Sequence, residues 1–293
     1  MRLLCIGECM IEMAPTADGN FSMGFAGDTF NTAWYARRLA ADGLRVGYFS
    51  AIGDDEPSAR MRNFIQGAGI EAELVERPGG SVGLYMISLK DGERSFSYWR
   101  SAAAARTLAD DLDTLPVAKG DIAYFSGITM AILPDTGKER LLAAMQKAAA
   151  AGATVAFDPN LRPRLWADTQ TMCHWIMRAA EVSQIALPSF EDEQSFFDDA
   201  DAEATAARYV NAGADLTIVK NGAGPILIRS HDGDETLTPE PATDVVDTTA
   251  AGDSFNAGVL VALAEGASAR DATARGSALA RKVIAARGAL VEV

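Results

Sequence analysis

The sequence has few of the residues that disulfides and most protein metal sites need. It contains 3 cysteines and 2 histidines in 293 residues. Cys5 and Cys9 lie in the apolar opening segment and Cys173 lies far from both, so the spacing indicates neither a disulfide framework nor a zinc site. His174 and His231 are widely separated, which disfavours a histidine-based metal site or triad. An odd number of cysteines without a framework is typical of the reducing cytosol, so the sequence predicts a cytoplasmic protein.

A long apolar run and a surplus of basic residues are also missing. No stretch approaches the roughly 18 apolar residues that a membrane-spanning helix needs. The apolar start is too short for a signal peptide and has no small-residue cleavage site after it. With 26 Lys and Arg against 40 Asp and Glu, the net charge is −14, which disfavours nucleic acid and anionic membranes as partners. A small anionic substrate needs only local cations, so the charge does not exclude one.

Apolar residues are abundant, at 48% of the sequence, and they recur in alternating strand-like and helix-like segments. This alternation predicts an α/β fold with a mostly parallel central sheet and helices on both of its faces. No linker divides the chain, so we expect one domain over residues 1–293. The expected strands are residues 3–7 with a continuation through 8–12, then 46–52, 121–126, 153–158, 184–187, 216–220, a hairpin of 225–230 with 235–239, and 289–292. The expected helices are 32–41 (capped by Asp28 or Thr29), 58–68, 135–151, 169–180, 203–212, the segment after Gly252, and 269–286.

One hairpin stands out from this alternation. Residues 82–89 and 93–100 have a period of two and are joined by Lys90-Asp91-Gly92, whose Asp-Gly pair is a strong hairpin turn signal. With a segment at about 12–26 it is expected to form a small sheet that projects from the body. One interpretation is a lid that closes over a polar substrate with Tyr85, Tyr98 and Arg100. The other is a dimer or core hairpin, and both can hold because an exposed sheet needs cover.

The stretch from Asp247 to Phe255, Asp-Thr-Thr-Ala-Ala-Gly-Asp-Ser-Phe, precedes an apolar helical segment. Small residues at a helix start leave backbone N–H groups uncovered, and these groups bind anions such as phosphate. Asp253 beside such a site can accept the proton of an attacking hydroxyl. The alternative is an ordinary helix start, with Thr248 or Thr249 as the N-cap and Asp253 favouring the helix dipole. This stretch alone does not decide between the two.

Polar residues also follow two of the expected strands. Asp158, Asn160 and Arg162 alternate along an extended segment, so their side chains are expected to point the same way and to serve a phosphate or a carboxylate. A surface loop with a structural salt bridge is the alternative. Lys220 is followed by Gly222 and Gly224, which would let the backbone approach a nucleotide. A hairpin turn explains these glycines about as well.

Together these segments resemble the ribokinase (PfkB-type) carbohydrate kinases. Residues 247–255 are similar to the family's C-terminal signature, Asp-Thr-x-Gly-Ala-Gly-Asp, with Ala250 at a position where glycine is usual. Residues 27–33, Gly-Asp-Thr-Phe-Asn-Thr-Ala, are similar to its sugar-binding signature. The resemblance covers the whole chain in order. It implies a ribokinase-like α/β fold with a small β-sheet lid, and it implies that Asp253 is the catalytic base beside Ala250, Ala251 and Gly252.

Within the family the chain is most similar to kinases that phosphorylate 2-keto-3-deoxy-D-gluconate at its terminal hydroxyl to give the 6-phosphate. The segments that carry this similarity are 6–12, 27–31, 98–100, 126–128 and 162–166. A neutral-sugar kinase, of the fructokinase or ribokinase type, is the alternative. The resemblance implies two sets of ligand contacts. They are Gly27, Asp28, Asn31, Tyr85, Tyr98, Arg100 and Arg162 for the sugar acid, and Asn160, Arg162, Lys220, Gly222, Gly224 and Gly252 for ATP.

The resemblance also implies Mg²⁺, and in some relatives a monovalent cation such as K⁺. The family's Asn-x-x-Glu motif, linked to Mg²⁺, falls on residues 189–192, where serine replaces asparagine and Asp192 replaces glutamate. Glu191 and Glu193 adjoin it, so which carboxylate acts on Mg²⁺, through water, stays open. Asp247 and residues 287–289 are the expected K⁺ site. The expected partners are a sugar acid, ATP and further copies of the chain, joined through the lid sheet.

Overall fold

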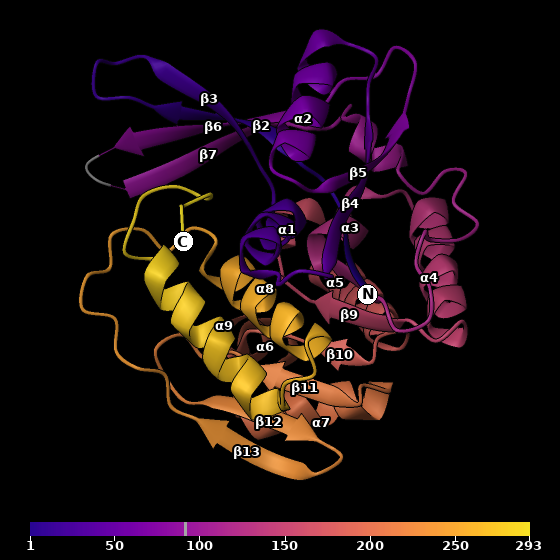
Figure 1. Ribbon diagram of the computed structural model, residues 1–293, viewed down its shortest axis with the longest axis vertical. Helices are drawn as coiled ribbons and strands as arrows, with labels where there is room; N and C mark the ends of the chain where they lie inside the picture. The colour runs from indigo at the N-terminus through magenta and orange to yellow at the C-terminus, as the bar shows by residue number, and fades with distance from the viewer. Residues whose placement is uncertain (91–92) are drawn as a thin grey trace.

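A large, mostly parallel sheet forms the centre of the structure, which is a computed structural model describing residues 1–90 and 93–293 (Figure 1). Its strands lie in the order β13-β12-β11-β10-β9-β8-β1-β4-β5, and β12 and β13 are antiparallel to their neighbours. This confirms the predicted α/β architecture. The strand bounds are β1 Arg2–Ile6, β4 Arg45–Ile52, β5 Glu71–Glu76, β8 Ile122–Ser126, β9 Thr154–Asp158, β10 Ile185–Ala186, β11 Leu216–Val219, β12 Ile226–Ser230 and β13 Gly233–Leu237.

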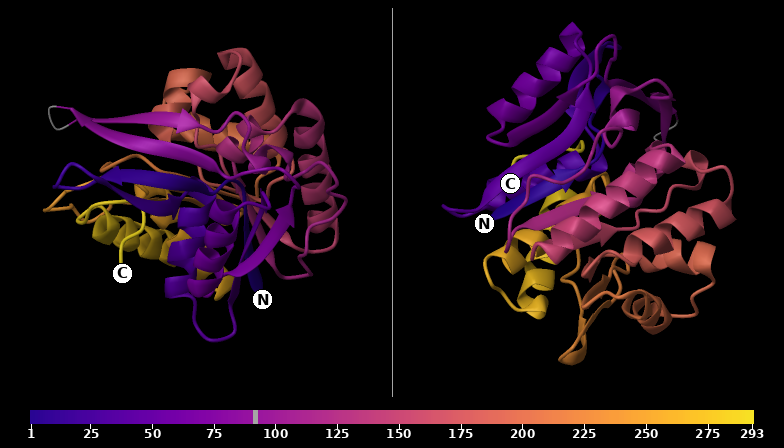
Figure 2. Two further views of the ribbon diagram at one scale, coloured as in Figure 1. Left: turned by 90° about the horizontal axis from the view of Figure 1, so that it is seen from above. Right: turned by 90° about the vertical axis from the view of Figure 1, so that its right-hand side faces the viewer.

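Helices cover both faces of the large sheet (Figure 2). Successive strand residues point to opposite faces, so Leu3 and Cys5 pack on one side and Leu4 and Ile6 on the other. The first face is covered by α1 Asp28–Leu39, α2 Glu56–Gly67, α8 Ala251–Ala264 and α9 Ala269–Val283. The second is covered by α3 Gly127–Ile132, α4 Asp135–Ala150 and α5 Thr169–Ala180. The helices α6 Phe190–Phe197 and α7 Ala202–Ala212 pack near β11 and β12.

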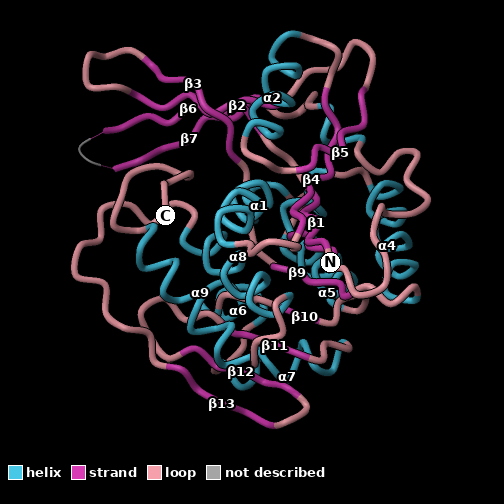
Figure 3. Tube along the Cα trace, viewed as in Figure 1, coloured by secondary structure: helices cyan, strands magenta, loops and turns pink. Residues whose placement is uncertain are grey.

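A second, smaller sheet projects from this body in the order β3-β2-β6-β7 (Figure 3). Its strands are β2 Met10–Pro15, β3 Phe21–Ala26, β6 Gly83–Lys90 and β7 Glu93–Trp99. The β6–β7 pairing is antiparallel and sets Tyr85 opposite Tyr98, which confirms the predicted hairpin. The predicted turn at Asp91-Gly92 lies outside the described residues. The C-terminal segment reaches back to this sheet, where Ala289 packs with Met10, Tyr85 and Ile87.

Three local predictions were wrong. The first strand does not continue through residues 8–12, because the chain leaves the large sheet after Gly7 and Met10 pairs with Ala26 in the small one. Residues 289–292 form no strand, since the hydroxyl of Tyr35 donates to Ala289 O (2.8 Å) and accepts from Val291 N (3.0 Å). Helix α1 is capped by Gly27, where a Cβ atom would lie 2.1 Å from the carbonyl oxygen of Glu8.

Some elements were not predicted at all. Strand β5 and the helices α3 and α6 were missed. Strand β5 is an edge strand of mixed composition, Glu-Ala-Glu-Leu-Val-Glu, with mostly half-buried side chains and therefore little alternation to detect. Among the described residues, no helix is long and apolar enough to span a membrane.

Candidate active site

A cavity of about 420 Å³ lies where the strands of the large sheet end, beneath the small sheet. In parallel sheets this edge collects the loops that follow the strands, so residues far apart in sequence meet there. Phe96, Tyr98 and Tyr85 of the small sheet line one side and the first turn of α8 lines another. The cavity brings together most of the predicted site residues, namely Gly27, Asp28, Asn31, Tyr85, Tyr98, Arg100, Asn160, Arg162, Asp192, Lys220, Ala250, Ala251, Gly252 and Asp253.

The start of α8 has the open backbone that a phosphate site requires. Its N-cap is Ala250, which adopts a left-handed conformation (φ 60°) and makes no side-chain cap. The alternative of a threonine cap at residue 248 or 249 was therefore wrong. The N–H of Ala251 donates to Thr248 O at 3.2 Å, while the structure records no acceptor among the described residues for the N–H groups of Ala250 and Gly252. Two donors at the positive end of the helix therefore face the cavity.

Asp253 lies in the first turn of α8, and its carboxylate accepts a hydrogen bond from Asn31 Nδ2 at 2.8 Å. Burial raises the pKa of Asp253 to about 7, and the negative charge of Asp28 adds to this effect. A carboxylate of this kind is matched to proton transfer near neutral pH, since a general base works best when its pKa is close to the operating pH. The geometry therefore suits Asp253 to accept a proton from a hydroxyl in the cavity.

Two of the predicted site residues, Asn160 and Asp28, form a hydrogen bond with each other at the cavity wall. Asn160 Nδ2 donates to Asp28 Oδ2 at 2.9 Å, which joins the loop after β9 to the start of α1. Asn160 has φ 38°, a conformation in which asparagine is better tolerated than most residues. Burial raises the pKa of Asp28, which is partly opposed by hydrogen bonds to its charged form. The contact fixes the positions of both side chains before any ligand binds.

Arg100, predicted to bind a substrate carboxylate, has a protein partner. It follows β7 and forms a buried ion pair with Glu8, which lies between β1 and β2. One carboxylate oxygen of Glu8 (Oε1) and Nε of Arg100 are buried without a hydrogen-bond partner in the described structure. Burial raises the pKa of Glu8. Glu8 was not among the predicted site residues, although an acidic side chain directly after a buried strand was a signal for it.

Arg162, the other predicted carboxylate partner, lies 3.8 Å from Asp192 (Nη1 to Oδ2). Asp192 is the only one of the three neighbouring carboxylates that lines the cavity. Glu193 points inward, where it pairs with Arg208 at 2.7 Å, and Glu191 is exposed. Burial raises the pKa of Asp192, an effect that the charge of Arg162 opposes. The side-chain directions therefore favour Asp192 over its neighbours as the residue that faces a ligand.

The model of the pfkB family carbohydrate kinases matches residues 1–292. The chain belongs to this family. It is 37% identical to 2-dehydro-3-deoxygluconokinase of Escherichia coli (strain K12), over 99% of this chain and 97% of the relative. It is 38% identical to the protein of the same name from Dickeya dadantii, over 99% of this chain and 96% of the relative. Kinases of the pfkB family use ATP.

The fold agrees with that of solved pfkB-family structures. Aminoimidazole riboside kinase from Salmonella enterica, in complex with aminoimidazole riboside and an ATP analog, superposes with a TM-score of 0.86. The alignment covers 99% of this chain and 96% of the relative at 23% sequence identity, which establishes the fold alone. The predicted ribokinase-like architecture is confirmed.

Three further predicted residues of this pfkB kinase lie outside the cavity wall. Gly222 and Gly224 form the turn after β11, where the N–H of Gly224 donates to Asn221 O at 2.7 Å. Their predicted contact with a nucleotide stays a prediction. Asp247 accepts a hydrogen bond from Gly288 N at 2.8 Å, so the two segments of the expected K⁺ site are neighbours.

Proposed function

We propose that this chain transfers the γ-phosphoryl group of ATP to the terminal hydroxyl of 2-keto-3-deoxy-D-gluconate, giving the 6-phosphate. The observation that carries the proposal is the pair of guanidinium groups, Arg100 and Arg162, on the wall of the cavity that contains Asp253. A neutral sugar needs no such cations, whereas a sugar acid offers a carboxylate that arginine binds in two-pronged fashion. The names of the relatives from Escherichia coli and Dickeya dadantii support the same substrate.

Asp253 acts as the general base in this proposal. It accepts the proton of the terminal hydroxyl as that oxygen attacks the γ-phosphate, and ADP leaves. The N–H groups of Ala250 and Gly252 donate to the phosphoryl oxygens as negative charge develops on them. Removing one such preorganised donor typically costs about 3–4 kcal/mol of barrier lowering. Ala251, whose N–H is bound to Thr248 in this geometry, stays a predicted third donor.

The residues present fit ATP and Mg²⁺. Lys220 and the open first turn of α8 supply positive charge for the phosphates, and Asp192 supplies one carboxylate at the cavity wall. Mg²⁺ is commonly held by one or two carboxylates together with waters and substrate phosphates, so a single acidic side chain acting through water suffices. When bound, Mg²⁺ neutralises charge on the phosphates. Asp192 would act on it through a water, and Asn160 and Arg162 would contact the nucleotide.

A monovalent cation such as K⁺ is a further part of the proposal. The carboxylate of Asp247 is held against the turn at residues 287–289 by Gly288 N. This turn includes Ala289, which lines the cavity, so a cation there would act on the loop before α8. A fructokinase variant from Vibrio cholerae, solved with fructose, ADP and a potassium ion bound, shares this fold with a TM-score of 0.84.

An assay of ADP release decides the substrate. A small panel of neutral sugars and 2-keto-3-deoxy sugar acids is compared with wild-type protein and with Arg100→Ala and Arg162→Ala. We expect each substitution to raise the KM for the best sugar acid by roughly 10- to 100-fold, since each removes a charge-assisted hydrogen bond. The KM for a neutral sugar should change much less.

The matched control is Arg60→Ala, because Arg60 is an exposed arginine of α2 whose only recorded ion pair within the described residues is with Glu56. It should leave both constants unchanged. An unchanged KM for the best substrate in both active-site variants would mean that the substrate needs no carboxylate partner. Fructose or ribose as the best substrate would favour the alternative, a neutral-sugar kinase.

We also propose that the chain forms a homo-oligomer through the small sheet. The face of this sheet that points away from the cavity carries Met13, Met23 and Met86 side by side in register. Phe21 and Trp99 flank them and are exposed. Exposed apolar patches of this kind commonly mark protein interfaces.

A further inference from the structure

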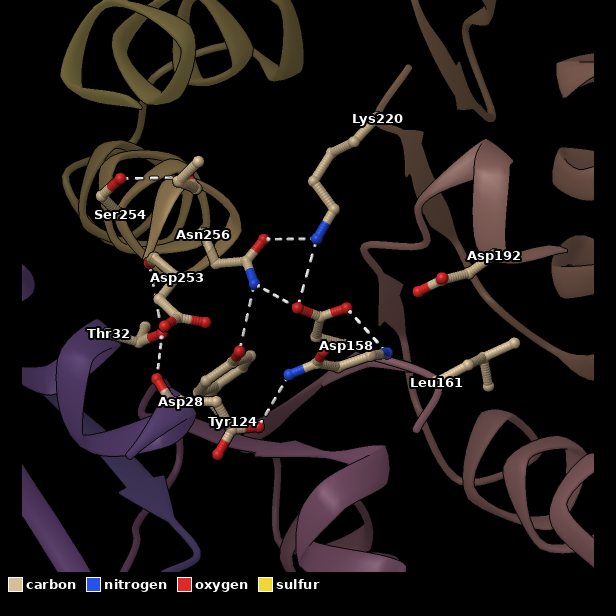
Figure 4. Close-up of polar contacts among 12 residues, drawn as sticks. Asp28, Thr32, Tyr124, Asp158, Leu161, Asp192, Lys220, Asp253, Ser254 and Asn256 are labelled. Atoms are coloured by element: carbon tan, nitrogen blue, oxygen red, sulfur yellow. Dashed lines mark hydrogen bonds and ion pairs between the residues drawn. The ribbon is translucent and has the colours of Figure 1, made fainter. Parts of the chain in front are cut away.

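Asn256 lies directly behind the cavity without lining it. It is fully buried on α8, three residues after Asp253, so the two side chains leave the helix on neighbouring turns. Its amide nitrogen donates to Asp158 Oδ2 at 2.6 Å and to the hydroxyl of Tyr124 at 3.1 Å. Its amide oxygen accepts from Lys220 Nζ at 3.3 Å. Both polar atoms of the side chain are therefore used, and Figure 4 shows all three contacts.

These contacts join residues from separate strands. Asp158 ends β9, Tyr124 lies in β8, and Lys220 directly follows β11. Lys220 Nζ also lies 3.2 Å from Asp158 Oδ2, the same oxygen that accepts from Asn256. The amide of Asn256 thus shares the Asp158 oxygen with the ammonium group and offers that ammonium a second, neutral acceptor. Lysine has a flexible four-carbon stem, so two acceptors define its position better than one.

The ammonium held in this way lies beside the first turn of α8. A Cβ atom built on Gly252 would lie 3.8 Å from Lys220 Nζ, and apart from the adjoining residues of α8 no other described atom lies within 4 Å of that position. The N–H of Gly252 is one of the two open donors at this helix start. A phosphoryl group bound to that N–H would therefore meet the positive end of the helix and the ammonium of Lys220 together.

We propose that Asn256 is a positioning residue that aims the ammonium of Lys220 at the phosphoryl group bound beside Gly252. The inference rests on the proposed phosphoryl transfer at Gly252 and Asp253. Without the amide, Asp158 is the one remaining recorded partner of the ammonium among the described residues. The ammonium then forms a tighter ion pair with Asp158 and interacts less with the phosphoryl group. The loss affects the developing charge of the reaction more than binding of the sugar, so kcat should fall while the sugar KM stays nearly constant.

The test is a double-substitution cycle on the full chain, using the best substrate of the panel. Asn256→Ala should lower kcat about 10- to 100-fold, the usual effect of losing a hydrogen bond to a charged group. If Asn256 acts through Lys220, then adding Asn256→Ala to Lys220→Met should lower kcat no further than about 2-fold. If the loss of kcat in the double variant equals the product of the losses in the two single variants, the residues act independently and the proposal is overturned.

Tyr124→Phe is the matched control, because it removes the third partner of the same amide without touching Lys220. It should keep kcat within about 2-fold of wild type, whatever it does to thermal stability. A loss of kcat in Tyr124→Phe as large as in Asn256→Ala would indicate a merely structural role and overturn the proposal. Circular dichroism and Tm are measured for every variant.

Asn256→Asp provides a second route if Asn256→Ala does not fold. It keeps the shape of the side chain but replaces the donor nitrogen with a carboxylate oxygen, which draws the ammonium of Lys220 away from the cavity. Its kcat should fall at least as far as that of Asn256→Ala, and a wild-type kcat would contradict the proposal. Should a neutral sugar prove the best substrate, the proposed sugar-acid function fails while this test proceeds with that sugar.

Discussion

Burial has the largest effect on the pKa of Asp253, and the carboxylates near it add to that effect. Asp28 and Asp158 both act on Asp253 in the direction that favours its protonated form, and burial has the larger effect. Asn31 opposes them by donating to the carboxylate at 2.8 Å. An aspartate with a pKa of about 7 is a stronger base than an ordinary one, whose pKa is about 3.9. Burying this carboxylate destabilises its charged form, and strongly shifted pKa values of this kind are typical of catalytic sites.

The first prediction is a pH dependence of the turnover. Asp253 must be ionised to accept a proton, so kcat/KM should fall roughly tenfold for each pH unit below about 7 and level off above it. Initial rates between pH 5 and 9, measured at saturating ATP, provide the profile. A flat profile down to pH 5 would show that no group with a raised pKa controls the reaction.

The second prediction concerns Asp253→Asn. Removing the base should lower kcat by about 10²–10⁴-fold, the usual contribution of a positioned general base. The folded-state pKa of Asp253 is raised, so its contribution to stability is fully present below about pH 4 and is lost as the pH rises through about 7. Asparagine has no such loss. The variant should therefore be more stable than wild type at pH 8, on the order of 2–4 kcal/mol, and nearly equal to it at pH 4.

Urea unfolding at both pH values measures this difference, and ADP release measures the activity. Asp244→Asn is the control, because Asp244 is exposed and lies outside the cavity wall. It should change neither quantity. Near-normal turnover in Asp253→Asn would contradict the assignment of the base. A stability difference between the variant and wild type that is the same at pH 4 and pH 8 would contradict the raised pKa.

Sequence alone pointed to Asp253 because its neighbours form a recognisable local pattern. The position of Glu8 after a buried strand was a signal of function, but its partner was not predictable, and neither was the role of Asn256. Glu8 finds Arg100 92 residues later, and Asn256 finds Asp158 98 residues earlier. Such pairs form only when the whole chain has folded, and no local spacing in the sequence predicts which residues will meet.

At the scale of elements, the start of α8 contains a strained backbone conformation at Ala250 that serves the proposed function. Ala250 is held at φ 60°, a left-handed conformation that costs an L-residue with a Cβ atom roughly 1–2 kcal/mol. Its carbonyl accepts the first helical hydrogen bond, from Ser254 N at 2.9 Å. The turn thereby brings its own N–H and that of Gly252 to the cavity. Glycine, usual at this position in the family pattern, would adopt the same turn without the strain.

The third prediction is that Ala250→Gly keeps the activity and raises stability. Relief of the left-handed strain outweighs the added freedom of the unfolded chain, and we expect a gain of up to about 1 kcal/mol in the free energy of unfolding. Ala250→Val should do the opposite, because a β-branched side chain tolerates this conformation worse than alanine does. Chemical denaturation of the three proteins gives the order, and a less stable Ala250→Gly would contradict the account.

Helices and strands were predictable where the spacing of apolar residues reflects burial of one face in the core. They were not predictable where contacts with distant side chains determine the backbone conformation. Helix α5 was predicted to the residue, and its apolar face buries Met172, Trp175 and Ile176. The apolar end of the chain, residues 289–292, looked like a strand. Its backbone groups are instead bonded by the side chain of Tyr35, a contact that no local pattern encodes.

At the scale of the whole molecule, the cavity is lined both by the small sheet and by the loops that follow the strands of the large sheet. The chain first enters the small sheet after Glu8 and leaves it for the last time at Arg100, and these two residues form an ion pair at that junction. The inner face of the small sheet carries Tyr85, Phe96 and Tyr98 over the cavity. Its outer face also carries exposed apolar side chains: Trp99 is 58% exposed and Phe21 is 44% exposed.

The last prediction follows from this outer face. If a second copy covers it, a charge placed there should separate the copies without disturbing the fold, since burying an unpaired charge is costly. We expect wild-type protein to be dimeric or larger at micromolar concentration and Met23→Asp to be mostly monomeric, as measured by light scattering. Val210→Asp is the control, because Val210 has a similar exposure (39% against 37%) but lies on α7. A monomeric wild type, or an oligomer that survives Met23→Asp, would contradict the proposed interface.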